Sequence, residues 1–361
     1  MKVAIVHDWL TGMRGGEKCL EVFCELFPDA TLFTLLHKKG SVSSVIENMR
    51  IKTSFLQYLP GVEKHYRNYL PLFPCAIESF DLKGYDLVLS SSHCVAKGAR
   101  IPKNALHICY CYTPMRYAWM FFEEYFGNYG HLKKMLVTGI LKWLREWDLK
   151  TNENVDFFIG IADNIKNRIM QFYGREASVI YPPVDVSRLN VSDKDENFYL
   201  VVSALVPYKR VDIAINAFNR LAKPLKVVGT GNSEKELRGI AKENIEFSGW
   251  VDETRLRDYY EKCSALIFPG EEDFGIVPVE AQACGKPVIA FAKGGALETI
   301  TPETGVFFKD QTIDSLVEAV KLFEKTKNGF TKESARDNAL RFSRQVFKQK
   351  IKEFIEGKIN A

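Results

Sequence analysis

The sequence predicts an α/β protein of two domains, each built on a doubly wound parallel sheet. A chain of 361 residues is too long for one ordinary core and suits two domains of roughly 150–200 residues. Hydrophobic residues make up 46% of the chain and charged residues 26%, which is typical of a globular protein. Short β-branched or aromatic runs alternate with longer amphipathic stretches, as in parallel α/β architectures.

Strands are expected at regular intervals in both halves of the chain. In the first half they fall within residues 2–9, 30–36, 86–92, 107–113, 156–162 and 177–181. In the second half they fall within residues 198–206, 225–231, 245–251, 264–270 and 286–292. A spacing of about 20–25 residues in the second half suits consecutive βα units of a doubly wound sheet.

A polar stretch, "YPPVDVSRLNVSDKDEN" (Tyr181 to Asn197), separates the two halves. Its two prolines favour extended backbone, and charged residues follow them, as in an interdomain linker. We therefore predict domains at residues 1–182 and 183–340, followed by a helical tail at 341–361. The acidic residues of this linker are interpreted as solvent-exposed charges and not as ligands of a metal ion.

Charge and composition narrow the class of protein. The net charge is +4 and lies wholly in residues 1–180, which is too weak for a nucleic-acid binder but compatible with anionic lipid headgroups. No apolar run is long enough to span a bilayer, and the N-terminus has no signal-peptide pattern. Cys109 and Cys111 lack further ligands nearby, so buried thiols in a reducing cytoplasm are favoured over a metal site.

The segment "PGEEDFGIVPVEAQACGKPVIAF" places two acids, Glu272 and Glu280, eight positions apart. A strand is expected to end before it and a helix to begin near Ile276 or Val277, so the N–H groups of Gly275, Ile276 and Val277 can donate to hydroxyl or phosphate oxygens. Glu272 and Glu280 can accept from sugar and ribose hydroxyls. Alternatively, Glu280 only complements the helix dipole and Glu272 is solvated.

With its continuations "ACGKPVIA" and "KGGALETI", this E-x7-E segment resembles the signature of family 4 retaining glycosyltransferases. Other matching pieces are "GGEK", "SSSHCVAKG", "CYCYTPMRYAW", "YGREASVIYPPVD" and "SALVPYKRVD", and the nearest subgroup is that of mannosyltransferases. The resemblance implies a GT-B fold, in which two Rossmann-like domains face each other across a cleft and the C-terminal helix crosses back to the first. The first domain would bind the acceptor and the second the nucleotide sugar.

The resemblance also implies roles for residues of the second domain. Transfer without a metal needs fixed positive charge on the departing diphosphate, and Lys209, with Arg210 beside it, fits this task. The family often has an arginine five positions before this lysine, whereas this chain has Ala204, so Arg210 replaces that contact or the contact is missing. Glu272 is expected to be catalytic. Phe274, Gly249 and Val251 join the expected donor-binding residues.

In the first domain, Gly15 and Gly16 open a helix whose N-terminus favours phosphate, although a tight turn alone would also explain them. The pattern is not that of an NAD site. His93 follows a predicted strand, and the resemblance places it near the donor sugar as a catalytic residue, the alternative being a structural histidine.

Two further stretches of the first domain have competing interpretations. Tyr112, Arg116 and Trp119 suit sugar stacking or a phosphate of the acceptor, but core packing is a rival explanation for the aromatic residues. The stretch "HLKKMLVTGILKWLREW" could lie on a membrane surface or be an ordinary surface helix.

The resulting hypothesis is a cytoplasmic enzyme that takes part in the assembly of surface polysaccharide, including lipopolysaccharide, or of glycolipid. If the enzyme is membrane-associated, it is expected at the inner face of the cell membrane. It would move mannose from GDP-mannose to a glycan or polyprenyl-linked saccharide with retention, without a metal or other cofactor. The alternatives are a UDP-hexose donor, an epimerase or phosphorylase on the same scaffold, and an inactive sugar-binding relative.

Overall fold

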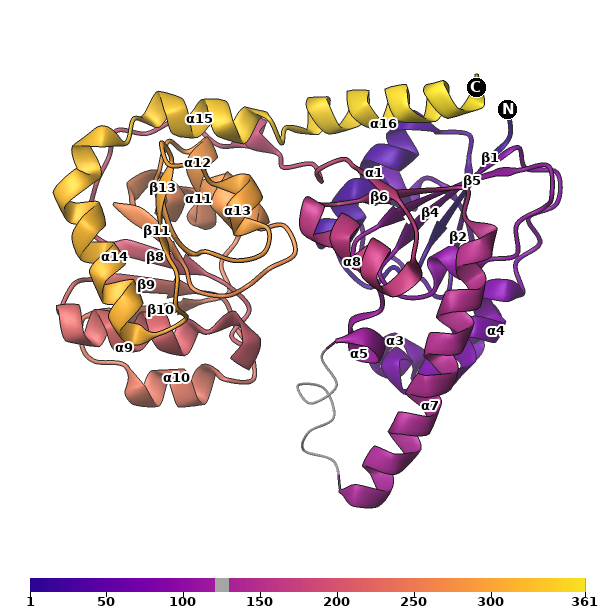
Figure 1. Cartoon of the computed structure of the whole chain (residues 1–361), viewed down its shortest axis with the longest axis horizontal. Helices are drawn as coiled ribbons and strands as arrows, with labels where there is room; N and C mark the ends of the chain where they lie inside the picture. The colour runs from indigo at the N-terminus through magenta and orange to yellow at the C-terminus, as the bar shows by residue number, and fades with distance from the viewer. Residues whose placement is uncertain (121–129, 361) are drawn as a thin grey trace. The chain divides into compact units, whose positions relative to one another are not determined.

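The computed structural model describes residues 1–120 and 130–360 (Figure 1). Contacts divide the chain into two compact units. The first comprises Met1–Pro182 and Phe347–Ala361, and the second comprises Pro183–Val346. Within the described ranges, no helix combines the length and the apolar character needed to cross a membrane.

The first unit is built on a seven-stranded parallel sheet with the order β3-β2-β1-β4-β5-β6-β7. Its strands are β1 (Val3–His7), β2 (Thr31–Thr34), β3 (Arg50–Thr53), β4 (Leu87–Ser92), β5 (Leu106–Cys111), β6 (Phe157–Gly160) and β7 (Ala177–Val179). Its helices are α1 (Gly15–Leu26), α2 (Ser44–Glu47), α3 (Val62–His65), α4 (Phe73–Glu78), α5 (Arg116–Trp119), α7 (His131–Lys150) and α8 (Asp163–Tyr173). The strand order reverses between β1 and β4, where ligands settle in such sheets.

Apolar side chains cover both faces of this sheet. Ala4 and Val6 of β1 belong to one core cluster, which also contains residues of α4 and α7. On the other face, Phe23 of α1 packs against Tyr110 of β5, with ring centroids 5.4 Å apart. Such burial on both faces explains why the strands of this sheet read as nearly continuous apolar runs.

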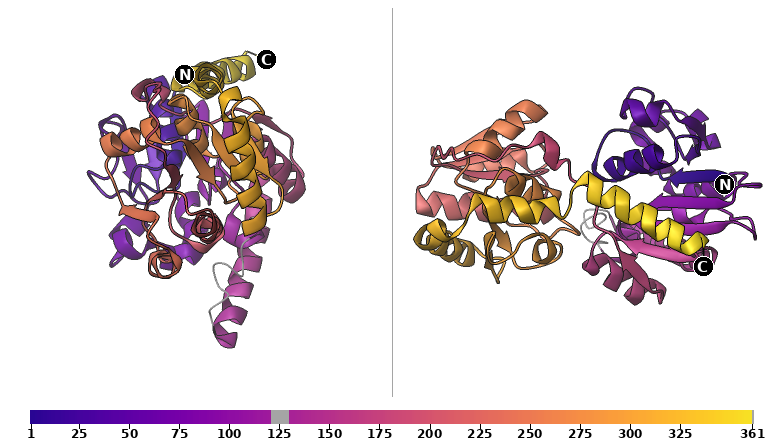
Figure 2. Two further views of the ribbon diagram at one scale, coloured as in Figure 1. Left: turned by 90° about the vertical axis from the view of Figure 1, so that its left-hand side faces the viewer. Right: turned by 90° about the horizontal axis from the view of Figure 1, so that it is seen from above.

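The C-terminal helix α16 (Arg344–Ile359) belongs, from Phe347 onward, to the first unit (Figure 2). Phe347 packs between Phe23 and Tyr110, and Phe354 lies edge-on to Phe157 of β6. The last helix of the chain therefore completes the core of the unit in which the chain begins.

The second unit contains a six-stranded parallel sheet with the order β10-β9-β8-β11-β12-β13. Its strands are β8 (Tyr199–Val202), β9 (Leu225–Val228), β10 (Ile245–Gly249), β11 (Ala265–Phe268), β12 (Val288–Phe291) and β13 (Gly305–Phe308). Its helices are α9 (Val211–Leu221), α10 (Glu234–Ile240), α11 (Glu253–Lys262), α12 (Ile276–Ala283), α13 (Ala296–Thr299), α14 (Ile313–Thr326) and α15 (Lys332–Leu340). Here the order reverses between β8 and β11.

The predicted α/β class with two parallel sheets is confirmed. Each predicted strand range overlaps a strand, but two edge strands, β3 and β13, were not predicted. β3 reads "RIKT", is half exposed and pairs only with β2. β13 has four residues and pairs only with β12. β3 therefore leaves no apolar run in the sequence, whereas β13, which reads "GVFF", is apolar and mostly buried but only four residues long.

Candidate active site

Lys209 and Glu272 meet at the point where the strand order of the second sheet reverses. Lys209 ends a short 3₁₀ turn (Pro207–Lys209) that follows β8, and Glu272 lies in the loop that follows β11. Lys209 Nζ is 2.5 Å from Glu272 Oε1, and the two side chains are 15% and 25% exposed. An ammonium group and a carboxylate are thus held together at the edge of the sheet where ligands usually bind.

Glycines allow the loops around this pair to approach one another. A Cβ on Gly270 would lie 2.8 Å from the carbonyl oxygen of Lys209, and one on Gly294 would lie 2.4 Å from that of Glu272. Gly294 also has φ +64°, and the N–H of Gly295 donates to the carbonyl of Glu272 at 2.8 Å. The backbone of the predicted catalytic acid is therefore fixed by its contact with the "KGG" loop after β12.

The loop after β9 joins this group, although sequence analysis did not single it out. Gly229 (φ +130°) and Gly231 lie so close to the loop after β8 that a Cβ would be 1.9 Å from Ser203 O and 2.2 Å from Leu205 O. The G-x-G pattern directly after a predicted strand is the feature of the sequence that could have indicated this loop. Loops after four neighbouring strands, β9, β8, β11 and β12, therefore lie at the same edge of the sheet as the Lys209–Glu272 pair.

Helix α12 begins at Ile276, as predicted, immediately after Gly275. Gly275 has φ +95° and no side chain to cap the helix, and the first N–H groups of a helix have no partner within it. Such a helix start favours an anion. The side chain of Phe274 is buried against Phe342, with ring centroids 5.4 Å apart, so only its backbone could contact a donor.

Glu280, the second predicted acid, lies on α12 and is half buried. Its Oε2 accepts a hydrogen bond of 2.8 Å from the hydroxyl of Tyr260, which is buried on α11. Burial, together with the charge of Glu280, raises the pKa of Tyr260 well above its usual value, so this phenol remains a donor. The contact orients the Glu280 carboxylate.

Arg210 is held by a neighbouring acid. Its Nε and Nη2 donate to the two carboxylate oxygens of Asp212, each at 3.1 Å, and Nη1 lies 3.4 Å from Gln311 Oε1. Gln311 in turn donates to the carbonyl of Pro269 at 2.9 Å. Arg210 was one candidate to replace the arginine that the family often has at the position of Ala204. In this structure its guanidinium is instead bonded to Asp212 through two nitrogens.

Gly249 and Val251, the residues suggested for base recognition, lie at the carboxyl end of the edge strand β10. Gly249 has φ +65°, and its carbonyl accepts from the N–H of Gly229 at 2.8 Å. They therefore share the sheet edge of Lys209 and Glu272. A second ion pair on this edge, Lys293 Nζ to Glu271 Oε2 at 3.0 Å, was not foreseen.

In the first unit, His93 follows β4 at the point where that sheet reverses its strand order. Its Nδ1 lies 3.0 Å from Asp8 Oδ2, and Asp8 follows β1 and is fully buried. His93 itself is about one-third exposed, and its ring lies edge-on to Trp9 at 4.5 Å between centroids. The imidazole is thus oriented by a buried carboxylate.

Asp8 also organises the backbone after β4. Its two oxygens accept from the N–H groups of His93, Cys94, Val95 and Ala96 at 2.7–3.0 Å. Burial by itself would raise the pKa of Asp8, but the charge of His93 and the hydrogen bonds from His93 lower it to about 2. Asp8 was not predicted as a site residue, although an acid directly after the first strand could have indicated one.

Gly15 and Gly16 form the first turn of α1, as predicted. The backbone N–H of Arg14 donates to Glu17 Oε2 at 3.0 Å, which satisfies one donor at this helix start. Tyr112, an expected acceptor contact, points its hydroxyl inward, where it donates to the carbonyl of Gly16 and meets Ser91 Oγ, both at 2.8 Å. Its observed role is to join the end of β5 to this turn.

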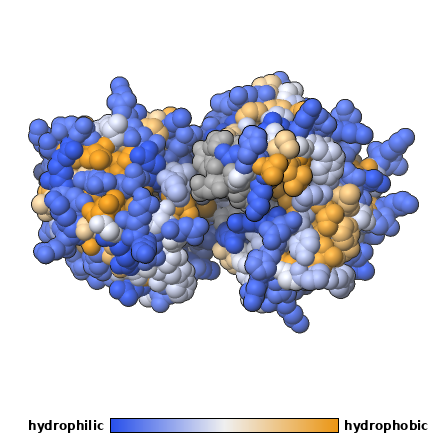
Figure 3. Space-filling view, turned by 90° about the horizontal axis from the view of Figure 1, so that it is seen from below, coloured by the Kyte–Doolittle hydropathy of each residue, from blue (hydrophilic) through white to orange (hydrophobic). Residues whose placement is uncertain are grey.

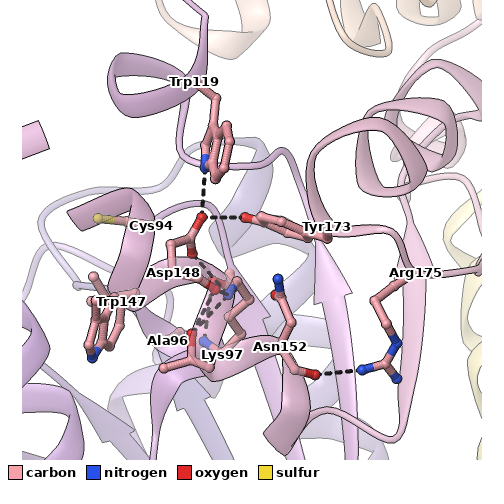
Figure 4. Close-up of polar contacts among 12 residues, drawn as sticks. Cys94, Ala96, Lys97, Trp119, Trp147, Asp148, Asn152, Tyr173 and Arg175 are labelled. Atoms are coloured by element: carbon pink, nitrogen blue, oxygen red, sulfur yellow. Dashed lines mark hydrogen bonds and ion pairs between the residues drawn. The ribbon is translucent and has the colours of Figure 1, made fainter. Parts of the chain in front are cut away.

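Trp119, another expected acceptor contact, is part of a buried polar network (Figure 4). Its indole N–H donates to Asp148 Oδ2 at 2.8 Å, and its ring stacks on Phe172 at 5.2 Å. Asp148 also accepts from the Tyr173 hydroxyl at 2.8 Å and pairs with buried Lys97 at 2.9 Å. Arg116 lies with Trp119 on α5 and is half buried.

The residues of the second unit match a known protein family. Residues 187–341 match the family described as "Glycosyl transferases group 1". An uncharacterized glycosyltransferase of Methanocaldococcus jannaschii is 33% identical over 198 residues, which make up 53% of this chain and 56% of that protein. The GDP-mannose-dependent monoacylated alpha-(1-6)-phosphatidylinositol monomannoside mannosyltransferase of Corynebacterium glutamicum is 36% identical over 132 residues, 32% of this chain and 35% of that protein. The matches thus span about half or less of these relatives.

Solved structures resemble the whole chain in fold. HepE of Anabaena, crystallised with UDP, has a TM-score of 0.71 at 17% identity and covers 99% of this chain and 100% of its own. Sucrose-phosphate synthase of Thermosynechococcus elongatus has a TM-score of 0.75 at 17% identity and covers all of both chains. At this identity the likeness shows the fold, and the predicted GT-B class is confirmed.

Proposed function

We propose that the chain is a retaining glycosyltransferase that moves a hexose from a nucleotide sugar to a saccharide acceptor, and the match of residues 187–341 to the glycosyl transferases group 1 family supports this proposal. The observation that carries this proposal is the pairing of Lys209 with Glu272, 2.5 Å apart, at the reversal point of the second sheet. The proposal assigns the diphosphate to the ammonium group and the hexose hydroxyls to the carboxylate.

Breaking the bond between the anomeric carbon and the donor phosphate leaves negative charge on the diphosphate. Lys209 and the N–H groups at the start of α12 supply positive charge and donors that stabilise this leaving group. The acceptor oxygen bonds to the same face of the anomeric carbon, and its proton passes to the departing phosphate oxygen. No carboxylate base is needed in this scheme, so Glu272 binds and orients the hexose.

The proposal gives Glu280 the ribose hydroxyls, because its carboxylate is half buried on α12 and is oriented there by the Tyr260 hydroxyl. His93 is the residue of the first unit that we assign to the reaction, as a donor to the transferred hexose or its phosphate. Asp8 holds the imidazole through Nδ1, which leaves Nε2 for this contact.

GDP-mannose is the donor we favour, and the name of the Corynebacterium glutamicum relative supports it. A UDP-hexose is the second candidate, and the UDP complex of the Anabaena neighbour supports that reading. For the acceptor we propose a glycan or lipid-linked saccharide of surface-polysaccharide or glycolipid assembly. Donor binding is proposed to need no divalent ion, since Lys209 and the helix start supply the charge.

A thermal-shift panel of GDP, UDP and ADP, each with and without EDTA, tests the donor assignment. GDP at about 100 times its Kd should raise Tm by roughly 5–10 °C, and EDTA should not change the shift. Lys209→Ala should remove most of the shift. Lys235→Ala, at an exposed position on α10, is the matched control and should keep it.

The outcomes separate the candidates. A larger shift with UDP than with GDP would replace the donor and keep the enzyme class. A chain that responds to no nucleotide, or a Lys209→Ala variant that responds like the unmutated protein, would contradict the proposed site. Incubation with radiolabelled GDP-mannose and a mixture of bacterial lipid-linked saccharides then tests transfer itself.

A further inference from the structure

We propose that His7 is a positioning residue for the reaction, which carries two protons and forms a buried ion pair with Glu17. The pair cancels the charge of Glu17 and so leaves Asp8 as the acid that sets the protonation of His93. The inference deepens the proposed function and rests on it, because it concerns how the imidazole of His93 is kept ready to donate to the nucleotide sugar.

His7 and Glu17 are polar side chains enclosed in the first unit. Hydrophilic side chains usually lie at the surface, and they cover most of the face shown in Figure 3. In contrast, His7 at the end of β1 is 1% exposed, and Glu17 in the first turn of α1 is 4% exposed. Because the solvent does not reach these groups, their hydrogen bonds must be made within the protein.

A chain of hydrogen bonds determines which nitrogen of His7 carries a proton. The carbonyl of Gly16 can only accept, so the Tyr112 hydroxyl donates its one proton there, at 2.8 Å. The Tyr112 oxygen must then accept from Ser91 Oγ at 2.8 Å. Ser91 Oγ, whose proton is now used, must accept from His7 Nδ1 at 3.0 Å. Nδ1 of His7 is therefore protonated as long as this chain is intact.

The other ring nitrogen of His7, Nε2, is left without a hydrogen bond. It is buried, has no hydrogen-bond partner among the described residues, and lies 4.0 Å from Glu17 Oε1. In a neutral imidazole with its proton on Nδ1, Nε2 presents a lone pair, which here would face a carboxylate. A second proton on Nε2 replaces this repulsion with an attraction that burial strengthens. The arrangement therefore favours the imidazolium form of His7.

Glu17 carries the negative charge that this ion pair requires. Burial by itself would raise the pKa of its carboxyl group, but the contact with His7 and the charge of His7 lower that pKa below its usual value. The other carboxylate oxygen, Oε2, accepts from the N–H of Arg14 at 3.0 Å. Glu17 is thus ionised and oriented, with Oε1 facing His7.

The His7–Glu17 pair interacts with the Asp8–His93 pair. His7 and Asp8 are adjacent in the chain, and the charge of each imidazole contributes to lowering the pKa of both acids. Buried carboxylates are costly unless an opposite charge accompanies them. Two buried acids therefore favour two imidazolium groups, one for each acid.

The other titratable groups around His7 do not change this balance. Burial raises the pKa values of the surrounding thiol and phenols, so that they stay neutral: Cys19 to about 12, and Tyr110 and Tyr112 well above their usual range. Lys18 follows Glu17 on α1, is half buried, and its charge acts on that thiol. The charge of His7 therefore depends on the two acids and on His93.

This balance of charge bears on the proposed contact between His93 and the donor. Because Nδ1 of His93 donates to Asp8, Nε2 can donate to the hexose or its phosphate only when the ring is an imidazolium. A Glu17 carboxylate without a partner would bind this proton more tightly through its field, and His7 cancels that field. His7 thus positions the proton of His93 without contacting the substrate.

Nuclear magnetic resonance of the full chain, labelled with nitrogen-15 at its histidines, tests the protonation of His7 directly. Substituting the five other histidines one at a time identifies the His7 signals in the unmutated protein by elimination. Both ring nitrogens of His7 should carry protons at pH 7. An unprotonated Nε2 at pH 7 would overturn the proposal, and this measurement does not require a His7 variant to fold.

The pH dependence of transfer tests the positioning role. The value of kcat/KM for radiolabelled GDP-mannose should fall at high pH, as His93 loses its proton. His7→Asn keeps an N–H that can donate to Ser91 but leaves Glu17 without an opposite charge, so this basic limb should move up by about 0.5–1 pH unit. His7→Asn combined with Glu17→Gln removes both charges and should return the limb to its original pH.

A histidine–glutamate pair elsewhere in the first unit provides the matched control. His37 Nε2 lies 3.1 Å from Glu47 Oε1, and both side chains are partly buried. His37→Asn should leave the basic limb where it is. If His7 only supported the fold, His7→Asn would lower kcat/KM at every pH without moving the limb, and the double variant would not restore it.

The outcomes distinguish this inference from the proposed function. An active enzyme whose basic limb does not move in His7→Asn, or moves to lower pH, would contradict the positioning role alone. Absence of transfer together with absence of any nucleotide-induced shift in Tm would contradict the proposed function, and the positioning role with it.

Discussion

His93 and Asp8 are joined twice in the first unit. The imidazole Nδ1 lies 3.0 Å from Asp8 Oδ2, and the backbone N–H of His93 donates to the same oxygen at 2.7 Å. Asp8 is fully buried, whereas His93 is partly exposed. The carboxylate therefore fixes both the position and the ring orientation of a histidine that remains accessible to a ligand.

Asp8→Asn should destabilise the protein in a pH-dependent way. The folded pKa of Asp8 is lowered from 3.8 to about 2, so its contribution is fully present above pH 4 and is lost as the pH falls toward 2. The shift corresponds to about 2 kcal/mol at neutral pH. Urea unfolding at pH 7, 4 and 3 should show a deficit of this size at pH 7 that narrows with acidification. The control is Asp86→Asn, which alters an exposed carboxylate and should show no such deficit. An Asp8→Asn variant as stable as the unmutated protein at pH 7 would contradict this role of Asp8.

His93→Ala should separate catalysis from folding. The substitution removes one partner of the buried Asp8 carboxylate, so Tm should fall, whereas nucleotide binding should change only slightly. Loss of one positioned donor at a reacting group typically costs about 100-fold or more in rate, and kcat for hexose transfer should fall by this order. His65→Ala, at an exposed histidine of α3, is the matched control. Transfer at an unaltered rate in the His93 variant would show that this residue is structural.

Glu272→Gln should bind the nucleotide at least as well as the unmutated protein and yet lose transfer. Without ligand, Glu272 neutralises Lys209, and this contact must open before the ammonium reaches a diphosphate. Removing the charge frees Lys209, so calorimetry should show GDP binding that is unchanged or up to about fivefold tighter, as expected for a partly exposed ion pair. Transfer should fall by about 100-fold or more, because the amide replaces the charged carboxylate that accepts hydrogen bonds from the hexose with a weaker acceptor and a donor. Loss of GDP binding in this variant would argue against competition between the acid and the diphosphate for Lys209.

Gly294→Ala should displace the loop that carries Glu272. Gly294 has φ +64°, and a Cβ there would lie 2.4 Å from the carbonyl of Glu272, so the variant should lose about 1–3 kcal/mol and most of its GDP binding. Gly239→Ala is the control, because α10 leaves open space at that position. It should be stabilised by about 0.5–1 kcal/mol. Differential scanning calorimetry with and without GDP measures both effects.

The sequence predicted the large regular features and several site positions. Apolar runs located all the strands of the described residues except β3 and β13, and the segment around Gly275 located the start of α12. The edge strand β3 escaped because its residues alternate without an apolar face. Asp8 escaped because its importance lies in four N–H groups more than eighty residues away.

The directions in which side chains point were the second feature that could not be predicted from the sequence. An aromatic residue after a strand suits either a ligand or the core, and spacing does not distinguish the two. The hydroxyl of Tyr112 and the indole of Trp119 both have partners inside the first unit, which supports the core-packing alternative for these atoms. Arg210 was likewise expected beside the diphosphate, whereas Asp212, only two positions away, holds its guanidinium.

A crystal structure of the protein with GDP tests the central assignment most directly. The account predicts that the diphosphate lies within hydrogen-bonding distance of Lys209 Nζ and of the N–H groups of Gly275, Ile276 or Val277, and that the Lys209–Glu272 contact of 2.5 Å has opened. A nucleotide bound elsewhere on the second unit, with Lys209 still paired to Glu272, would contradict it.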